Sequence, residues 1–236
     1  MATAEEEFIA GVELGGTSCV AAIAKAESPT RILYRFETVT TVPRDTLKAV
    51  CAFLRSKQKE LGITSYRTFG IASFGPIDLH RSSKTYGCIT TTPKQGWRNV
   101  NVLEDYFRSE FGDKVPIAIE TDVNAPALAE VFSINNRRIT TNLAYITVGT
   151  GVGVGVVANG APVHGLMHPE GGHIVVPRMP GDEYPGCCSF EHQVCVEGMV
   201  NSHAIAGRTG VDRTKLDTLP DSHQVWEKVI DVLGVT

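Results

Sequence analysis

The chain has 236 residues, of which 42% are hydrophobic and 20% charged, which is enough apolar material for a folded core. Its 22 basic and 26 acidic residues give a net charge of −4, which provides no electrostatic basis for binding nucleic acid or an anionic membrane. No apolar run reaches the roughly 18 residues of a membrane-spanning helix, the start MATAEEEF is unlike a secretory leader, and six scattered cysteines do not make a disulfide framework. We therefore expect a soluble, cytoplasmic protein of one or two domains.

Short apolar stretches alternate with helical patterns along the chain. Stretches rich in Val, Ile and Phe and bounded by Gly, Pro or Asp predict strands. In chain order they cover 8–14, 19–24, 69–74, 115–119, 143–148 and 152–158. Apolar residues on one face predict helices at 46–60, 102–111, 124–132 and 197–206, with Asn101 as the N-cap of the second. Strands that alternate with helices indicate an α/β fold.

One pattern occurs twice. GVELGGTSCVAAIA near the start and YITVGTGVGVGVVA from Tyr145 both read as strand, glycine turn, strand, and their glycines lie 134 residues apart (149 − 15). Unrelated hairpins would also use glycine, but turn geometry does not require the adjacent Thr. No G-x-G-x-x-G or Walker motif is present. We therefore predict two similar domains, each with a turn whose backbone N–H groups and Thr hydroxyl can bind phosphate.

Several segments, in this order, resemble the ROK family of sugar kinases: GVELGGT, SFGPID, TDVNAPALAE, ITVGTGVGVG, HPEGGHI and the Cys/His cluster before CVEG. ITTTPKQGW and HPEGGH are most similar to the zinc-containing fructokinases of that family. The resemblance implies an actin/hexokinase-like (ribonuclease H-like) duplicated two-domain α/β fold, with ATP and sugar meeting in an active-site cleft. We expect the domain that is smaller in the family at 1–121, and the domain that is larger in the family, with the zinc loop, at 122–236, where it is incomplete relative to the family. Family members continue further, so the chain is expected to lack the part that completes the adenine pocket.

Asp122 follows the apolar stretch 116–119 and precedes the helical pattern at 124–132, which Asn124 could help cap. A carboxylate at such a junction projects into a cleft, where it can accept the proton of a hydroxyl during phosphoryl transfer. An Asp that merely caps the helix explains the position equally well from the residues alone. The resemblance implies that Asp122 is the catalytic base. Thr121 stands where the family often has Asn, so one sugar contact is expected to differ.

Five potential metal ligands fall within 23 positions (195 − 173 + 1): His173, Cys187, Cys188, His192 and Cys195. The spacing Cys188-x3-His192-x2-Cys195, with His173 upstream, suits tetrahedral zinc. Buried free cysteines and a surface histidine are the alternative for any one of them, but their number in one segment favours structural zinc. The resemblance implies His, Cys, His, Cys ligation. The segment is one residue longer than the usual pattern, so Cys187 and Cys188 compete, and counting from His173 selects Cys188. The other cysteines are expected to be packing residues: Cys19, Cys51 and Cys88.

The resemblance also assigns the remaining contacts. ATP and a Mg²⁺ held through water are expected at Glu13, Gly15, Gly16, Thr17, Gly149, Thr150 and Gly151. The sugar is expected at Gly75, Glu170, His173 and Glu197, on a loop that zinc fixes. Lys94 and Trp97 are candidates for the acceptor side, although an exposed Lys and a core Trp explain them equally well. Ser18 stands where many members have a Lys, which removes one phosphate contact.

These observations favour an ATP-dependent hexose kinase that converts D-fructose to fructose 6-phosphate, with glucose or mannose as alternative substrates. A sugar-binding or regulatory module without turnover is the second hypothesis, because the chain is short for the family. A zinc hydrolase using His173 and Glu170 is the least favoured, because four protein ligands would leave no open coordination position. ROK repressors have an N-terminal helix-turn-helix, for which a first strand at residue 8 leaves no room, so we expect no nucleic-acid partner. A homodimer stays open.

Overall fold

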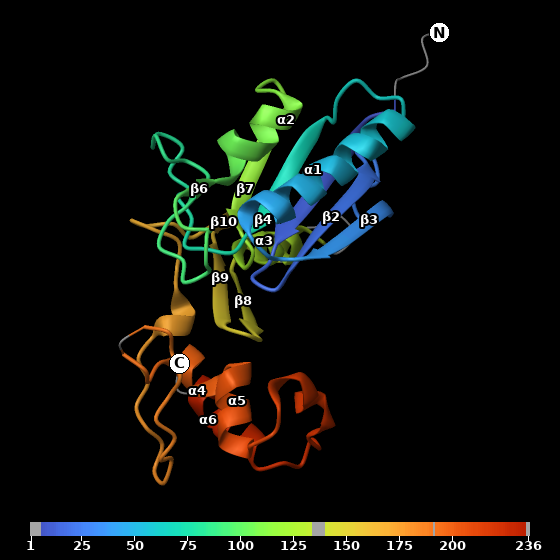
Figure 1. Ribbon diagram of the computed structural model, residues 1–236. Coiled ribbons are helices and arrows are strands. Elements are labelled where there is room, and N and C mark those ends of the chain that lie inside the picture. Colours follow the sequence, from blue (N-terminus) through green and yellow to red (C-terminus); the bar gives the residue numbers. More distant parts are fainter. Residues whose placement is uncertain (1–5, 134–139, 191, 235–236) are drawn as a thin grey trace. The chain divides into compact units, whose positions relative to one another are not determined.

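A computed structural model describes residues 6–133, 140–190 and 192–234 (Figure 1). The chain divides into two compact units. Unit 1 comprises the chain up to Ala125 together with Gly165–His168, and unit 2 comprises Pro126–His164 and the chain from Pro169 onward. The division expected after residue 121 lies four residues earlier (125 − 121) and does not include the return of the chain to unit 1 at 165–168.

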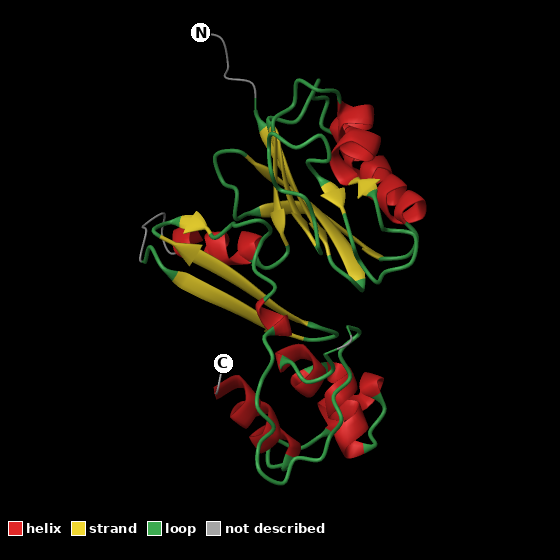
Figure 2. Cartoon of the chain, turned by 90° about the vertical axis from the view of Figure 1, so that its left-hand side faces the viewer, coloured by secondary structure: helices red, strands yellow, loops and turns green. Residues whose placement is uncertain are grey.

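Unit 1 is built on a five-stranded sheet with the order β3-β2-β1-β4-β7. Its strands are β1 (Phe8–Leu14), β2 (Ser18–Lys25), β3 (Ile32–Val39), β4 (Thr68–Ser73) and β7 (Ile117–Thr121). β1, β4 and β7 are parallel, with Leu14 opposite Ser73 and Ser73 opposite Thr121, while β2 pairs antiparallel with β1 on one side and with β3 on the other (Figure 2). The three parallel strands therefore end at one edge of the sheet, which is where ligands bind in open α/β sheets.

The core of unit 1 lies between this sheet and the helices that Figure 1 shows in front of it. Helix α1 (Pro43–Glu60) starts with Pro, whose fixed φ suits the first helical turn, and buries Leu47, Val50 and Leu54 completely. Four aromatic rings pack together beneath it, with centroids 4.8–6.3 Å apart: Tyr66, Phe69, Phe107 and Phe111. A short pair of strands, β5 (Cys88–Ile89) and β6 (Val100–Asn101), completes the unit.

Two elements of unit 1 differ from expectation. The helix predicted at 102–111 is a π-helical segment η1 (Leu103–Arg108) followed by one turn of α-helix, α2 (Ser109–Phe111), because apolar spacing does not distinguish the wider turn. Asn101 acts as its cap, since its side-chain oxygen accepts from the N–H groups of Leu103 and Glu104, both at 3.0 Å. Strand β3 was not predicted, because it lies at the sheet edge and has no buried residue and no apolar run.

Unit 2 contains a three-stranded antiparallel sheet, β10-β9-β8, followed by a helical part. Its elements are α3 (Asn124–Ser133), which begins at the end of unit 1, β8 (Leu143–Val148), β9 (Val152–Ala158), β10 (Ala161–Pro162), η2 (Gly171–His173), α4 (Val196–Val200), α5 (Ser202–Thr209), η3 (Arg213–Thr218) and α6 (Val225–Gly234). The helix predicted at 197–206 is broken at Asn201, whose backbone is extended and whose side chain caps α5 through the Ala204 N–H.

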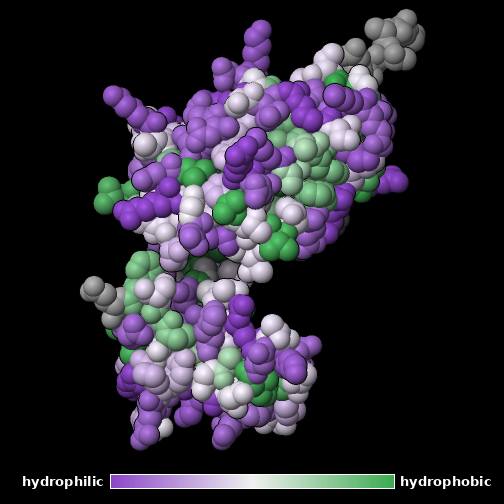
Figure 3. All heavy atoms as spheres, in the orientation of Figure 1, coloured by the Kyte–Doolittle hydropathy of each residue, from purple (hydrophilic) through white to green (hydrophobic). Residues whose placement is uncertain are grey.

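The apolar cores of unit 2 are small. One cluster joins β9, α4 and α6 through Val152, Val176, Val196, Met199, Val200 and Val232, and another holds Ala127, Val131 and Val157. A buried ion pair adds to them, with the Arg208 guanidinium donating to both oxygens of Asp182 at 2.7 and 2.9 Å. Most of the face seen in Figure 3 is hydrophilic, with apolar residues in small groups. Within the described residues, every helix is too short or too polar to cross a membrane.

Candidate active site and metal centre

The first glycine turn joins β1 to β2 and is held by its own backbone and two side chains. Gly15 N donates to Ser18 O at 3.0 Å, the Thr40 hydroxyl donates to Gly15 O at 2.7 Å, and Lys94 Nζ donates to Gly16 O. A Cβ on Gly15 would lie 2.7 Å from Ser18 O, so only glycine fits, whereas the space around Gly16 is open. The turn is therefore fixed in shape and accessible at its tip.

Lys94 and Trp97 have separate roles. Lys94 is half-buried, and burial lowers the pKa of its ammonium group. Its contact with Gly16 places a cation at the first turn. Trp97 is fully buried, its indole N–H donates to Thr41 O at 2.7 Å, and its ring packs 5.0 Å from that of Phe74. Trp97 is therefore a core residue, as the second of the two sequence-based explanations stated.

Asp122 lies directly after β7, at the same sheet edge as the first turn. Its N–H donates to Ser73 O at 2.9 Å, and its side chain is half-buried. Burial, together with the negative charge of Glu13 at the end of β1, raises the pKa of Asp122 to about 6. A carboxylate with this pKa is ionised at neutral pH and is still basic enough to accept a proton.

The helix that follows Asp122 is capped by a different residue. The hydroxyl of Thr121 accepts from Asn124 N at 3.0 Å, so Thr121 provides the cap and Asn124 is the first helical residue. The expectation that Asn124 caps this helix is therefore wrong. Asn124 is fully buried, and its amide donates to Glu120 Oε1 at 3.1 Å. These bonds fix the backbone on both sides of Asp122 without using its carboxylate as a cap.

Gly75 lies at the end of β4, next to a histidine that sequence analysis did not single out. His168 is buried, its Nε2 accepts from Ile77 N at 3.2 Å, and its ring would lie 3.0 Å from a Cβ on Gly75. A side chain at position 75 would therefore require the His168 ring to shift. His168 is the first residue of the HPEGGH motif and, with Gly165–Met167, belongs to unit 1, whereas the rest of the motif belongs to unit 2.

The second glycine turn joins β8 to β9 in unit 2. Gly149 N donates to Gly151 O, and Ser202 N at the start of α5 donates to Gly149 O, both at 2.8 Å. Arg213 Nη1 lies 3.5 Å from the Thr150 hydroxyl. Gly149 and Thr150 are exposed. As expected, the turn is a hairpin with an accessible backbone, and a basic side chain lies beside it.

Glu197 contacts this turn. Its Oε2 accepts from Val152 N at 2.9 Å, and a Cβ on Gly151 would lie 2.6 Å from the same oxygen. The sequence pattern predicted Glu197 as a sugar contact and did not reveal this bond, because the two residues are 45 positions apart. Glu170, the other carboxylate predicted to bind sugar, is exposed just before η2, where its carbonyl accepts from His173 N at 2.9 Å.

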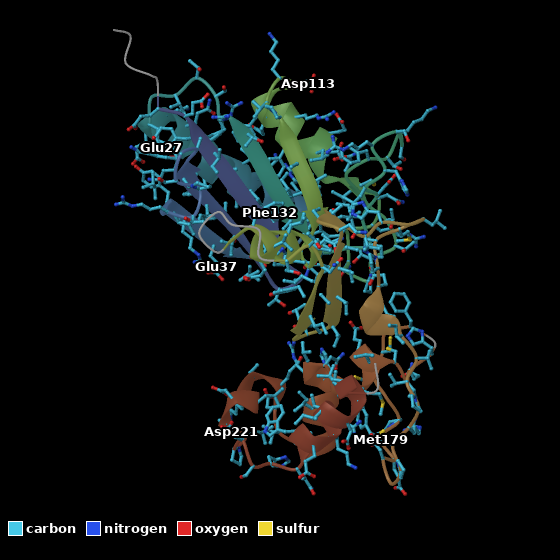
Figure 4. The ribbon with its side chains drawn as sticks, turned by 180° about the vertical axis from the view of Figure 1, so that it is seen from behind. Glu27, Glu37, Asp113, Phe132, Met179 and Asp221 are labelled. Carbon is cyan, nitrogen blue, oxygen red and sulfur yellow. The ribbon has the colours of Figure 1, made fainter. Side chains whose placement is uncertain are left out.

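Four side chains in the loop before α4 form a compact cluster. The Cys188 Sγ lies 3.5 Å from His173 Nδ1 and 3.3 Å from His192 Nε2, and the Cys195 Sγ lies 3.8 Å from His173 Nδ1. All four ligand atoms lie within 4.8 Å of one another. Zinc bonds of about 2.0–2.3 Å at tetrahedral angles separate ligands by roughly 3.3–3.8 Å. The donor set and its spacing therefore fit a zinc ion. Figure 4 shows this loop, on which Met179 is labelled.

The surroundings of the cluster suit a thiolate-bound metal. Backbone N–H groups donate to both sulfur atoms, from Phe190 to Cys188 at 3.5 Å and from Gly198 to Cys195 at 3.3 Å. Burial raises the pKa of the Cys195 thiol to about 11, a cost that a bound cation offsets. Cys187 does not point into the cluster, since its thiol donates to Asn201 Oδ1 at 3.3 Å. The other three cysteines are free and buried, which confirms their expected packing role: Cys19, Cys51 and Cys88.

The predicted residues thus form two sets, one in each unit. Unit 1 gathers Glu13, Gly15, Gly16, Thr17, Gly75 and Asp122 at the ends of its parallel strands. Unit 2 gathers Gly149, Thr150, Gly151, Glu170, Glu197 and the Cys/His cluster around the start of β9.

The comparison with known families decides the identity. The sequence model of the ROK family matches residues 9–226. The chain belongs to the ROK family. Among curated relatives it is similar to the fructokinase of Zymomonas mobilis, with 41% identity over 84% of this chain and 64% of the relative. It is also similar to the fructokinase of Lactococcus lactis, with 36% identity over 93% of this chain and 69% of the relative.

The fold agrees with solved structures of the family. A ROK family glucokinase from Streptomyces griseus, in complex with glucose and AMPPNP, matches with a TM-score of 0.63 and 26% identity over 86% of this chain and 62% of that one. The expected family, its mixed α/β hexokinase-like fold and the similarity to fructokinases are therefore confirmed. The chain spans about two thirds of the length of the curated fructokinases that it matches.

Proposed function

We propose that the chain is an ATP-dependent hexose kinase that converts D-fructose to fructose 6-phosphate in the cytoplasm. The observation that supports this most directly is Asp122, a half-buried carboxylate with a pKa raised to about 6 at the strand ends beside the first glycine turn. The ROK family membership and the similarity to fructokinases supply the reaction class.

In this proposal Asp122 is the general base. Its carboxylate accepts the proton of the primary hydroxyl of the sugar as that oxygen forms a bond to the γ-phosphorus of ATP. The bond between the γ-phosphorus and the bridging oxygen breaks, and ADP leaves with the electron pair. Phosphoryl transfer needs an aligned hydroxyl and a base more than covalent help from the protein. Because Thr121 caps the next helix, the Asp122 carboxylate is available for this role.

The two glycine turns are proposed to hold phosphate oxygens. The open tip at Gly16 and Thr17 in unit 1 and the exposed tip at Gly149 and Thr150 in unit 2 offer backbone N–H groups and a hydroxyl each. Lys94, which donates to Gly16 O, adds a cation where Ser18 provides none. A Mg²⁺ held through water near Glu13 would neutralise phosphate charge when bound.

The sugar is proposed to contact Gly75, Glu170, His173 and Glu197. His173 turns its Nδ1 toward the Cys/His cluster, so its Nε2 can donate to a sugar hydroxyl. The carboxylates of Glu170 and Glu197 can accept from neighbouring hydroxyls. A zinc ion on His173, Cys188, His192 and Cys195 would have a structural role, fixing the loop that presents these groups.

Measurement of ADP release with a panel of hexoses tests the proposal. We expect turnover with fructose, and Asp122→Asn should lower kcat by about 10²–10⁴. Asp113→Asn, which changes an exposed carboxylate labelled in Figure 4, should leave turnover unchanged. Undiminished turnover by Asp122→Asn would exclude Asp122 as the base. A different preferred hexose would change the substrate only. Sugar-induced thermal stabilisation without ADP release would instead support a binding module.

A further inference from the structure

Val152, the first residue of β9, is contacted from two sides by residues that flank the Cys/His cluster, Gly172 before it and Glu197 after it on α4. Its N–H donates to Glu197 Oε2 at 2.9 Å. Gly172 lies close to the Val152 carbonyl, since a Cβ on Gly172 would be 1.9 Å from that oxygen. A Cβ on Gly171 would likewise lie 2.8 Å from the Val154 side chain. Val152 itself is buried. The backbone N–H and C=O of Val152 therefore both face residues that flank the Cys/His cluster.

Each of these contacts lies next to a cluster residue. Gly172 precedes His173 directly, and Glu197 follows Cys195 by two positions on α4. The Cys195 sulfur also accepts from Gly198 N at 3.3 Å and so starts the helix that carries Glu197. The two ends of the loop, the segment that follows His173 and the segment that follows Cys195, are hydrogen-bonded to each other, since Val196 N donates to Ile174 O at 3.0 Å. A change at either end of the cluster therefore reaches Val152 through one or two residues.

Val152 in turn borders the second glycine turn. The turn comprises Gly149, Thr150 and Gly151, and Glu197 Oε2 lies against the last of these, 2.6 Å from where a Cβ would be. Thus one carboxylate packs against the turn at Gly151 and accepts from the next N–H, that of Val152. The other end of the turn is held by Ser202 N, which donates to Gly149 O at 2.8 Å.

We propose that metal occupancy of the Cys/His cluster orders the second glycine turn, with Glu197 as the positioning residue that connects them. The loop thereby prepares the turn for a nucleoside triphosphate, in addition to presenting groups to the sugar. This consequence for nucleotide binding rests on the proposed function, whereas the ordering of the turn does not. Without a bound metal, the two ends of the loop are less constrained, the hydrogen bond from Val152 N to Glu197 weakens, and the second glycine turn becomes mobile.

Hydrogen–deuterium exchange of the Val152 amide tests the ordering directly. We expect zinc to slow this exchange about tenfold or more, because the N–H is bonded to a charged acceptor. An amide of the β1–β2 hairpin in unit 1, such as that of Val20, should not respond. Equal exchange at Val152 with and without zinc would overturn the proposal.

Two variants at one position separate ordering from general unfolding. In zinc-loaded protein, Glu197→Ala should speed Val152 exchange by about tenfold, whereas Glu197→Gln retains an oxygen that accepts the N–H and should stay near the original rate. Zinc content and far-UV circular dichroism identify any variant that loses the metal or unfolds. If both zinc-loaded variants exchange like the original protein, Glu197 is not the connection and the proposal fails.

Calorimetry with AMPPNP addresses the nucleotide. We expect the dissociation constant to rise about tenfold when zinc is removed and to rise likewise in Glu197→Ala. Equal affinity with and without zinc would overturn the nucleotide consequence. Absence of binding in every state, together with zinc-dependent exchange at Val152, would refute the proposed kinase function while leaving the ordering of the turn established.

Discussion

Among the single residues, Asp122 shows how one environment affects both reactivity and stability. Burial and the neighbouring Glu13 raise its pKa to about 6, above the value of 3.8 expected for an unfolded chain. The native chain therefore binds the proton of the Asp122 carboxyl group more tightly than the unfolded chain does. The stabilising contribution is fully present below pH 3.8 and is lost as the pH rises through 6, so the ionised carboxylate destabilises the fold at neutral pH.

Asp122→Asn should consequently stabilise unit 1 at neutral pH while lowering turnover. We expect the free energy of unfolding to rise by about 1–3 kcal/mol at pH 7.5 and to change little at pH 4. Urea unfolding followed by the fluorescence of Trp97, in a Trp226→Phe background, measures this in the unit that contains Asp122. A variant less stable than the original protein at pH 7.5 would contradict the environment assigned to Asp122.

The same pKa predicts the acidic limb of the rate profile. Because the base must be ionised to accept a proton, kcat/KM should fall tenfold per pH unit below an apparent pKa near 6. The measurement is the rate of ADP release between pH 5 and 8 at substrate concentrations well below KM, where the enzyme is mostly free. The zinc content is checked at each pH. A profile that is flat down to pH 5 would show that a group other than Asp122 limits the rate.

Lys94 provides a further test at this scale. Its Nζ donates to Gly16 O and is half-buried, so an anion at the turn would offset part of the cost of burying it. Lys94→Met should weaken AMPPNP binding about tenfold, since a charge-assisted hydrogen bond is lost, and should leave fructose binding unchanged. Lys84→Met, which removes an exposed lysine in a loop, is the control. Equal nucleotide affinity in the two variants would remove Lys94 from the phosphate site.

At the level of elements, the loop that bears the Cys/His cluster distinguishes two adjacent cysteines. The Cys188 thiol lies in the cluster, whereas the Cys187 thiol donates to Asn201 Oδ1. We expect Cys188→Ser to purify with a tenth or less of the zinc in the original protein and Cys187→Ser to retain it, because a neutral hydroxyl is a poor substitute for thiolate. Metal analysis of both proteins is the measurement. Loss of zinc only in Cys187→Ser would reverse the assignment.

The elements also show which features a sequence reveals. Strands β1, β8 and β9 were predicted with their observed bounds, because continuous apolar runs next to glycine turns mark them whether or not the strand is buried. The edge strand β3 was missed, since Arg35 and Glu37 interrupt its apolar residues and leave no continuous apolar run. The helix at 197–206 was predicted as continuous because the pattern does not show that Asn201 caps a new helix.

The candidate site was predictable to a similar extent. Residue types and spacing located the glycine turns, Asp122 and the four cluster residues, because these chemistries need particular side chains. The sequence did not indicate that His168 packs on Gly75, that Thr121 caps α3 or that Glu197 binds Val152 N. Two of these contacts join residues far apart in the sequence, and the third requires a choice between two possible caps that the residue types alone do not decide.

For the whole molecule, the two units differ in how their interiors are stabilised. Unit 1 has one continuous core that includes five strands, α1 and four packed aromatic rings. Unit 2 has two small apolar clusters, a buried Asp182–Arg208 ion pair and the Cys/His cluster. Small cores depend more on bound metals, so unit 2 should depend on zinc for its stability while unit 1 should not.

Removal of zinc should therefore lower the thermal midpoint of unit 2 selectively. We expect the midpoint of unit 2, monitored by hydrogen–deuterium exchange of peptides from α4 and α5, to fall by about 5 °C or more. The midpoint of unit 1, monitored by Trp97 fluorescence in Trp226→Phe, should change by less than about 2 °C. Trp97 lies in the core of unit 1 and Trp226 lies in unit 2, so this background reports on unit 1 alone. Equal shifts of both transitions would show that the units unfold together.

The contact of His168 with Ile77 has a consequence for synthesis on the ribosome. All five strands of the first sheet have been made by residue 121, but the histidine that accepts the Ile77 N–H appears 43 residues after Ala125 (168 − 125). At translation rates of about 5–20 residues per second, this delay lasts about 2–9 s. Meanwhile the ribosome adds both strands of the β8–β9 hairpin. The nascent unit 1 can form its sheet early, but its 75–77 loop is completed only after the 126–164 segment of unit 2 has been translated.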